Sequence, residues 1–193
     1  DHIIDSMVFP EGYEIKIRGE IEQMEKSFQN LGVGLLLGII LVYLIIVPLF
    51  RSFRQPLIII FTVPLGLIGV VAILYLTNTH LNIQSIMGVI MMVGIAVAYG
   101  NILISRINQL YEEGDIMADA IIKGCGDRLK PVIMTMLTTV LGLLPMAMGL
   151  QIGGEANVPL ARAVIGGVLS ASILTLFVIP VLYSILSKKE IKS

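Results

Sequence analysis

The sequence predicts an all-α membrane protein built as a bundle of five transmembrane helices. Three observations lead to this prediction: the composition is apolar, the apolar residues form runs long enough to cross a bilayer, and those runs carry almost no charge. Of the 193 residues, 56% are hydrophobic and 14% are charged. In soluble domains about 45–50% of the residues are apolar and about a quarter are charged. The mean hydropathy of +0.92 also indicates a membrane protein.

Five runs reach the length of about 20 residues that a helix needs to cross a hydrocarbon core roughly 30 Å thick. Apart from Arg162 at the edge of the last run, they contain no Asp, Glu, Lys or Arg. They also lack the strict alternation of polar and apolar residues that is typical of membrane β-strands. The predicted spans are residues 31–50, 57–76, 83–105, 131–150 and 160–186.

The basic residues predict the orientation of these spans. Nine of the 13 Lys and Arg residues fall in the loop 51–56, the loop 106–130 and the tail 188–193. Short loops rich in Lys and Arg stay in the cytoplasm, so these loops and the C-terminus are expected there. An odd number of spans then places the acid-rich N-terminal segment on the outer side.

Residues 1–30 differ from the rest of the chain. Tyr13, Ile15 and Ile17 alternate with charged residues, which predicts an amphipathic strand. The stretch 20–30 predicts a polar helix that leads into the first span. Because a lone strand buries nothing without partners, we expect this segment to end a preceding domain and the chain to be a piece of a longer protein.

Two further features shape the predicted bundle. The loop 106–130 contains an amphipathic stretch, which predicts a separate cytoplasmic linker helix over about residues 112–126 that ends at Gly124 and Gly126. Prolines inside spans tend to kink them, and kinks favour either packing or helix movement. The prolines concerned are Pro64, Pro145 and Pro180.

Small residues spaced four apart favour close helix packing. Such pairs occur at Gly34 with Gly38, Gly94 with Ala98, and Gly166 and Gly167 with Ser170 and Ala171. We therefore expect the five helices to pack closely together.

The sequence gives no support for enzyme chemistry. His2 and His80 stand apart from any Cys, His or Asp cluster, so no metal site or cofactor is expected. Nucleotide-binding and nucleophile motifs are absent. The single cysteine, Cys125, has no partner for an internal disulfide.

Polar side chains at membrane depth are the remaining candidates, because burying them is costly unless they pair or face water. In the third span these are Tyr99 and Asn101; in the fourth they are Thr135, Thr138 and Thr139. A threonine in a membrane helix commonly bonds its own backbone. The amide of Asn101 cannot be satisfied in that way, and its alternatives are a helix–helix hydrogen bond or a functional role.

At this point the motifs resemble a known family. The stretch 28–70, with its link FRSFRQP and its motif VPLG, resembles membrane helices eight and nine of resistance-nodulation-division (RND) efflux permeases. The stretches 91–114, 127–149 and 159–186 resemble helices ten, eleven and twelve. Residues 10–28 resemble the last strand of the periplasmic porter domain and its lead into the membrane. The resemblance covers essentially the whole chain.

The resemblance implies a proton-motive-force-driven exporter of drugs, other small molecules or metal ions in the bacterial inner membrane, with the N-terminal segment periplasmic. It also implies a homotrimer that binds a periplasmic adaptor and an outer-membrane channel, and a missing N-terminal half that carries the aspartates of the proton relay. On this chain, the arginine of the relay falls on Arg128 and its threonine on Thr135.

One family position departs from the multidrug pattern. The relay lysine falls on Ala98, as in metal-efflux members that also lack it. We therefore expect Tyr99 or Asn101, with Thr135, to complete a modified relay. Two alternatives stay open: a membrane scaffold that does not transport, and a relative that exports lipid or protein.

Overall fold

The computed structural model describes residues 20–150 and 153–187, and within them the chain is helical with no strand. The helices are α1 (Glu20–Phe50), α2 (Arg54–Ile60), α3 (Thr62–Leu76), α4 (Ile83–Glu112), α5 (Met117–Ala147) and α6 (Val158–Ser187), with a short 3₁₀ helix at Glu155–Asn157. The predicted strand around Tyr13 lies outside the described residues. The five-helix membrane bundle is confirmed, because five helical stretches are long and apolar enough to cross a membrane.

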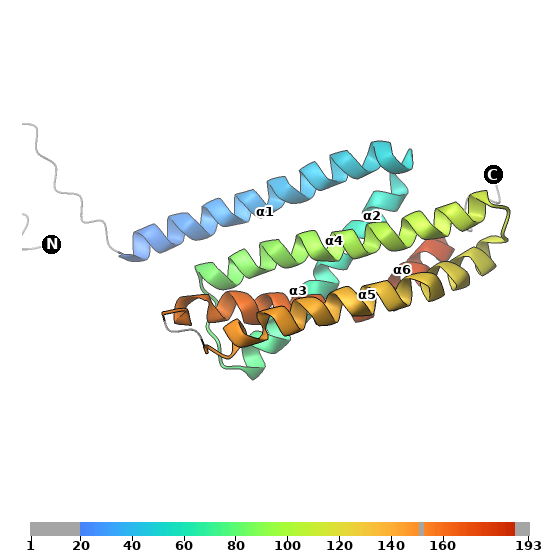
Figure 1. Cartoon of the computed structure of the whole chain (residues 1–193). Coiled ribbons are helices and arrows are strands. Elements are labelled where there is room, and N and C mark those ends of the chain that lie inside the picture. The colour runs from blue at the N-terminus through green and yellow to red at the C-terminus, as the bar shows by residue number, and fades with distance from the viewer. Residues whose placement is uncertain (1–19, 151–152, 188–193) are drawn as a thin grey trace, which may run out of the picture.

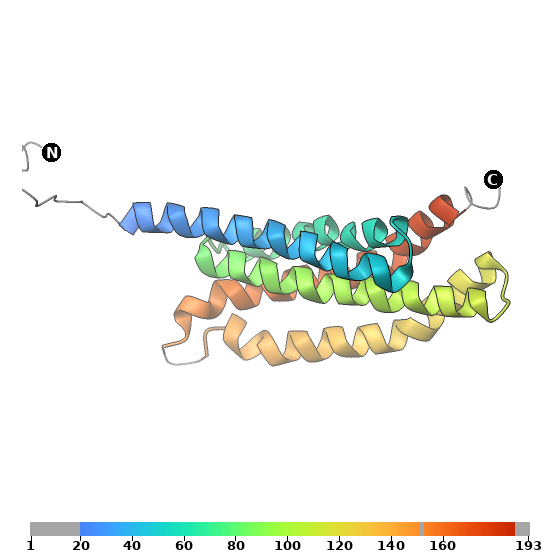
Figure 2. The ribbon, with the colours of Figure 1, turned by 90° about the horizontal axis from the view of Figure 1, so that it is seen from above.

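Helices α4 and α6 form the centre of the bundle (Figure 1). α6 packs against α2, α3, α4 and α5. Among the described helices, α1 packs substantially only against α2 and α4. Seen from above, α1 and α5 lie on opposite flanks of α4 (Figure 2). The core of the bundle is made of fully buried side chains such as Ile59, Met92, Ile104 and Ile107.

The two flanking helices are the least buried. In the most apolar stretch of α1 and of α5 only 6% of the residues are buried, against 44–50% in the other three spans. Their large exposed hydrophobic side chains include Leu41 and Ile45 on α1 and Leu137 and Leu141 on α5. Such apolar faces pack favourably against lipid hydrocarbon or against further apolar helices.

The second predicted span is broken, as Pro64 predicts. α2 ends at Ile60, Phe61 forms the junction, and α3 begins at Thr62. Pro64 has no N–H to donate to the carbonyl of Ile60 four residues earlier, and its ring crowds that carbonyl. By contrast, α5 and α6 continue through Pro145 and Pro180.

The predicted linker helix over residues 112–126 is wrong as a separate element. α4 runs on to Glu112, and α5 runs without interruption from Met117 to Ala147, through both Gly124 and Gly126. The reason is close packing: a Cβ on Gly124 would lie 2.8 Å from Ile107 Cγ1 of α4. Gly124 therefore lets α5 approach α4 and does not end the helix.

The small-residue faces divide into two groups. Gly166 and Gly167 meet neighbouring helices closely, because a Cβ on either would lie 2.3 Å from Ile73 or Met92. At Gly34, Gly38 and Gly94 an added Cβ would meet nothing within 4 Å. The predicted close packing is therefore right for α6 and wrong, among the described helices, for these faces of α1 and α4.

Candidate functional site

Helix α4 positions the candidate residues 98–101, and both its ends are fixed by polar contacts. At its start, the N–H of Ser85 donates to Asn82 Oδ1 at 2.9 Å and the N–H of Asn82 donates to Ser85 Oγ at 2.8 Å, a reciprocal capping box. Near its end, Arg106 forms an ion pair with Asp127 of α5, with Nη2 and Oδ2 2.7 Å apart.

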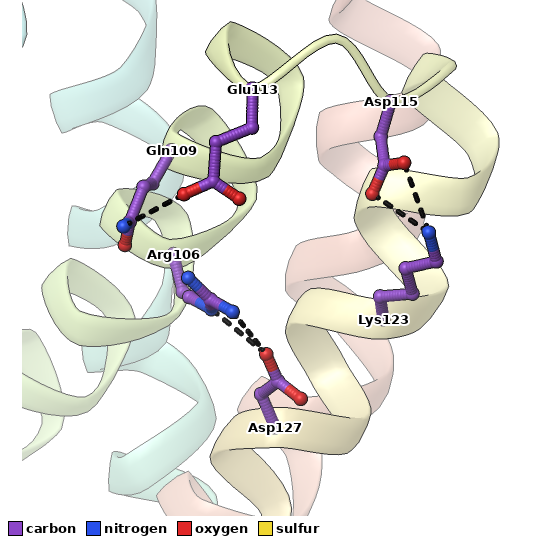
Figure 3. Close-up of polar contacts among 6 residues, drawn as sticks. All are labelled: Arg106, Gln109, Glu113, Asp115, Lys123 and Asp127. Carbon is purple, nitrogen blue, oxygen red and sulfur yellow. Dashed lines mark hydrogen bonds and ion pairs between the residues drawn. The ribbon is translucent and has the colours of Figure 1, made fainter.

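Three polar pairs gather at the turn between α4 and α5 (Figure 3). Beside the Arg106–Asp127 pair, Lys123 Nζ bonds Asp115 Oδ1 at 2.9 Å, and Gln109 Nε2 donates to Glu113 Oε1 at 3.0 Å. All three pairs are exposed to a large degree, so each contributes little stability alone. Together they mark a charged, water-facing end of the bundle.

One face of α4 is left open by the other described helices. Gly94, Ala98 and Ser105 lie on it at helical spacings of four and seven, and all three are exposed. A Cβ added at Gly94 would meet nothing within 4 Å. The family lysine position, Ala98, therefore points away from the core of this bundle.

Asn101 lies at the edge of this open face, three residues after Ala98. It is half-buried, and its side-chain oxygen Oδ1 is buried without a hydrogen-bond partner among the described residues. Leaving such an acceptor unpaired costs about 1–3 kcal/mol. The described helices leave this oxygen unsatisfied and shield it from solvent, so the amide would have to turn toward the open face to meet a donor there.

Tyr99 occupies a different face of α4. It is 6% exposed and packs with Val132 of α5 and with Val164 and Val168 of α6. Two residues correspond to about 200° around a helix, so Tyr99 and Asn101 point in nearly opposite directions.

Thr135 and Arg128 share a face of α5 with Val132, at helical spacings of three and four. The hydroxyl of Thr135 donates to the carbonyls of Pro131 at 3.1 Å and Val132 at 3.0 Å. Arg128 carries a buried Nε with no hydrogen-bond partner among the described residues. Thr138 and Thr139 likewise bond their own helix, at Met134 and Thr135.

The five sequence-predicted positions therefore form two groups. Tyr99 lies beside Val132, next to Thr135 and Arg128, at the contact of α4 and α5. Asn101 and Ala98 lie at the open face of α4. Of the two candidates for a modified relay, Tyr99 packs in the same apolar cluster as Val132, which lies one turn before Thr135 on α5; Thr135 itself is exposed.

Sequence analysis missed two polar groups that join distant helices. Arg162 of α6 donates through Nε to the carbonyl of Ala147 at 3.1 Å, and through Nη1 to Thr79 Oγ1 at 2.7 Å and the carbonyl of Thr77 at 3.5 Å. Its signal was its position as the single charge of the last span.

The second missed group is Gln55 of α2, Asn108 of α4 and Tyr183 of α6, which bond one another at the opposite end of the bundle. The sequence indicates this group only weakly, because each of the three residues lies near the expected boundary between a span and a loop.

Within the described ranges, no three His, Cys, Asp or Glu side chains are grouped so that they could hold a metal ion. The polar groups of the bundle are amides, hydroxyls and arginines. They can donate, accept and orient hydrogen bonds at membrane depth.

Comparison with known proteins identifies this arrangement. Residues 1–187 match the model of the AcrB/AcrD/AcrF family. The chain belongs to this family. The resemblance to RND permeases that the motifs predict is thereby confirmed.

Members of the AcrB/AcrD/AcrF family with 29–35% identity include both metal-resistance and solvent-efflux proteins. The chain is 35% identical over 181 residues to the cobalt-zinc-cadmium resistance protein CzcA of Cupriavidus metallidurans, covering 94% of this chain and 17% of that protein. It is 29% identical over 171 residues to the toluene efflux pump membrane transporter TtgB of Pseudomonas putida, covering 89% and 15%.

A crystal structure of a heavy metal efflux pump has the same fold, with a TM-score of 0.80 and 31% identity over 97% of this chain and 19% of that one. The chain thus spans less than a fifth of the length of these relatives.

Proposed function

We propose that this chain is the C-terminal membrane half of a proton-motive-force-driven RND permease that exports small molecules or metal ions across the cell envelope. The observation that carries the proposal is the match of its whole bundle to a heavy metal efflux pump, at a TM-score of 0.80. Its role is then transport and not enzyme catalysis. No cofactor is needed, since the energy comes from the proton gradient.

Metal ions are the first substrates to test. The relatives named for cobalt, zinc, cadmium or nickel resistance are 34–35% identical to this chain, and the toluene pump is 29% identical. The alanine at position 98 agrees with this choice, because the resemblance to metal-efflux members includes the loss of the relay lysine.

The proposed site is the third span together with its α5 neighbours. The proton-carrying helix of the missing half would pack on the open face of α4, beside Ala98 and Asn101. A donor on that helix would satisfy the unpaired Oδ1 of Asn101. Tyr99, Thr135 and Arg128 would line the relay on the side of α5.

The remaining partners follow from the same assignment. We propose a homotrimer in the bacterial inner membrane, joined to a periplasmic adaptor and an outer-membrane channel. Residues 1–30 would be the end of the porter domain and its lead-in helix, 31–187 the transmembrane domain and 188–193 a cytoplasmic tail. The α1–α2 turn, the α4–α5 turn and the end of α6 lie at one end of the bundle (Figure 1), which supports placing the basic loops on the cytoplasmic side.

The test uses the complete permease gene in a host whose own metal exporters are deleted. We expect the wild-type protein to raise tolerance to zinc, cobalt or cadmium, and a protonophore to abolish metal efflux. The variants Asn101→Ala and Tyr99→Phe test the relay, with Ser184→Ala, an exposed position near the end of α6, as the matched control. Unchanged proton coupling in both relay variants would contradict the modified relay. Metal tolerance without any metal efflux would favour a scaffold that does not transport.

A further inference from the structure

Gln55, Asn108 and Tyr183 form a closed polar network between three helices. Asn108 Nδ2 donates to Gln55 Oε1 at 2.9 Å, and Gln55 Nε2 donates back to Asn108 Oδ1 at 3.3 Å. The hydroxyl of Tyr183 donates to the same Oδ1 and accepts from Gln55 Nε2 at 3.4 Å. The three residues are 53, 75 and 128 positions apart in pairs, so the network depends on the tertiary fold.

The network lies among apolar side chains. Tyr183 is 5% exposed, and Ile58, Ile59, Ile107 and Ile179 of the same helices are exposed by 4% or less. Gln55 and Asn108 are half-buried, so their bonds are partly shielded from water, and an amide that loses its partner is only partly compensated by water. All three groups are neutral, and each bond joins side chains of two different helices.

Elsewhere, α4 meets α6 and α3 through small and apolar groups. A Cβ on Gly88 would lie 2.7 Å from the carbonyl of Leu160, and one on Gly100 would lie 3.2–3.3 Å from Ile59, Ile179 and Thr62. Apolar contact of this kind is strong but non-directional. It holds the helices together without fixing how far α4 slides or rotates along its neighbours.

We propose that Gln55, Asn108 and Tyr183 form a polar latch that fixes the position of α4 against α2 and α6, and that Asn108 is thereby a positioning residue for Asn101. Asn108 follows Asn101 by seven residues, which is two helical turns and about 10 Å along the axis. The two amides therefore lie on the same side of one continuous helix. A shift at the latch is transmitted to Asn101 because the helix between them is unbroken.

The latch itself is tested by a distance measurement that does not depend on transport. Spin labels are placed at Tyr111→Cys on α4 and Ser184→Cys on α6, both exposed positions, in a Cys125→Ser background of the whole natural protein. We expect Asn108→Leu to shift or broaden the distance distribution between the labels. An unchanged distribution overturns the latch.

Two further variants separate the latch from a general loss of packing. Ser170→Ala removes another interhelical bond, from Ser170 Oγ to the carbonyl of Leu65 at 2.7 Å, which joins α6 to α3 and leaves α4 out. It should leave the label distances unchanged. The exchange variant Gln55→Asn with Asn108→Gln keeps the summed length of the two amides and should restore the wild-type distribution; a distribution that stays shifted contradicts the amide pairing.

The positioning role rests on the proposed function and is tested by a double-mutant cycle on proton-coupled transport. Asn108→Leu alone should lower the transport rate about fivefold, as expected for the loss of one hydrogen bond in a membrane. In an Asn101→Ala background, Asn108→Leu should lower the transport rate no further, whereas the effect of Ser170→Ala should be the same in both backgrounds. If the fold-losses of Asn108→Leu and Asn101→Ala multiply in the double variant, the positioning role is wrong. An Asn101→Ala variant with normal transport overturns the relay and this role together, and the label distances still decide the latch.

Discussion

At the scale of single residues, Arg162 is the side chain whose loss should matter most for stability. It bonds the carbonyl at the end of α5 and the segment that follows α3, so one guanidinium joins three parts of the chain. Arginine does this well because its five donors lie in a fixed plane. Each pair of Figure 3 joins only two side chains near the turn between α4 and α5.

We predict that Arg162→Gln lowers the free energy of unfolding by about 2 kcal/mol, because hydrogen bonds to a charged group are worth about 1.5–3 kcal/mol each and the shorter amide keeps part of them. Denaturation of the protein in detergent micelles measures this change. Lys130→Gln, at an exposed position of α5, is the control and should alter stability by less than about 0.5 kcal/mol. Equal effects of the two would contradict the bridging role.

Thr135 and Thr138 form a matched pair for testing function at residue scale. Both hydroxyls bond carbonyls of α5, at 3.0–3.1 Å and 2.8 Å, so Thr→Val should change the stability of either by under about 0.5 kcal/mol. They lie about one turn apart on neighbouring positions of the helix surface, and only Thr135 falls on the relay threonine of the family resemblance. We predict that Thr135→Val lowers proton-coupled transport about fivefold or more and that Thr138→Val does not; transport assays in vesicles decide between them.

The sequence was a partial guide at this scale. It singled out Asn101 because an amide cannot be satisfied by its own helix, and the unpaired Oδ1 agrees with that argument. It also allowed that the threonines bond their own backbone, which all three do. It did not find Gln55, Asn108 and Tyr183, because no local pattern brings together residues that meet only through the fold.

At the scale of elements, the contact of α3 with α6 is the tightest in the bundle. A Cβ on Gly69 would lie 2.1 Å from the carbonyl oxygen of Gly166, and one on Gly166 would lie 2.5 Å from the carbonyl oxygen of Gly69. The two backbones therefore touch, and Ser170 adds a hydrogen bond to Leu65 beside them. Close approach of backbones is a main source of helix association in membranes.

Replacing Gly69 by Ala should force these helices apart. We predict a loss of about 1–3 kcal/mol, the range for overfilling a packed interior. Gly38→Ala on α1 is the matched control: a Cβ there meets nothing within 4 Å, and the better helix former should be neutral or stabilising by up to about 1 kcal/mol. Unfolding measurements on both variants test the contrast, and equal losses would contradict the observed contact.

Element boundaries show which sequence signals are decisive. Pro64 lies at the junction of α2 and α3, whereas α5 and α6 continue through Pro145 and Pro180, so a proline alone does not decide whether a span is interrupted. Gly124 and Gly126 did not end a helix, because glycine ends a helix only where the chain turns into the left-handed region, and here the tight contact with Ile107 keeps the backbone helical. The small-residue pairs on α1 and α4 likewise could not predict which helix, inside or beyond this chain, lies against them.

At the scale of the whole molecule, the loops fall at two ends of the bundle. The starts of α4 and α6 lie at one end, and the α1–α2 and α4–α5 turns lie at the other (Figure 1). In a Cys125→Ser background, we predict that His80→Cys reacts with a membrane-impermeant maleimide in intact cells and that Lys130→Cys reacts only after lysis. The reverse pattern would contradict the proposed orientation.

The whole-molecule account also requires that this bundle works with the rest of a longer permease. The open face of α4 and the unpaired Asn101 oxygen are explained if a proton-carrying helix packs there. A protein that merely anchors or assembles a complex would have no need of a proton gradient. Proton dependence therefore separates the two functions.

The most direct measurement is zinc uptake by inside-out membrane vesicles that contain the complete permease, with an imposed pH gradient. We predict uptake that stops when the gradient is collapsed and that falls about fivefold or more with Asn101→Ala, since that variant removes the partner proposed for the relay. Zinc uptake that is unaffected by both changes would contradict the central claim.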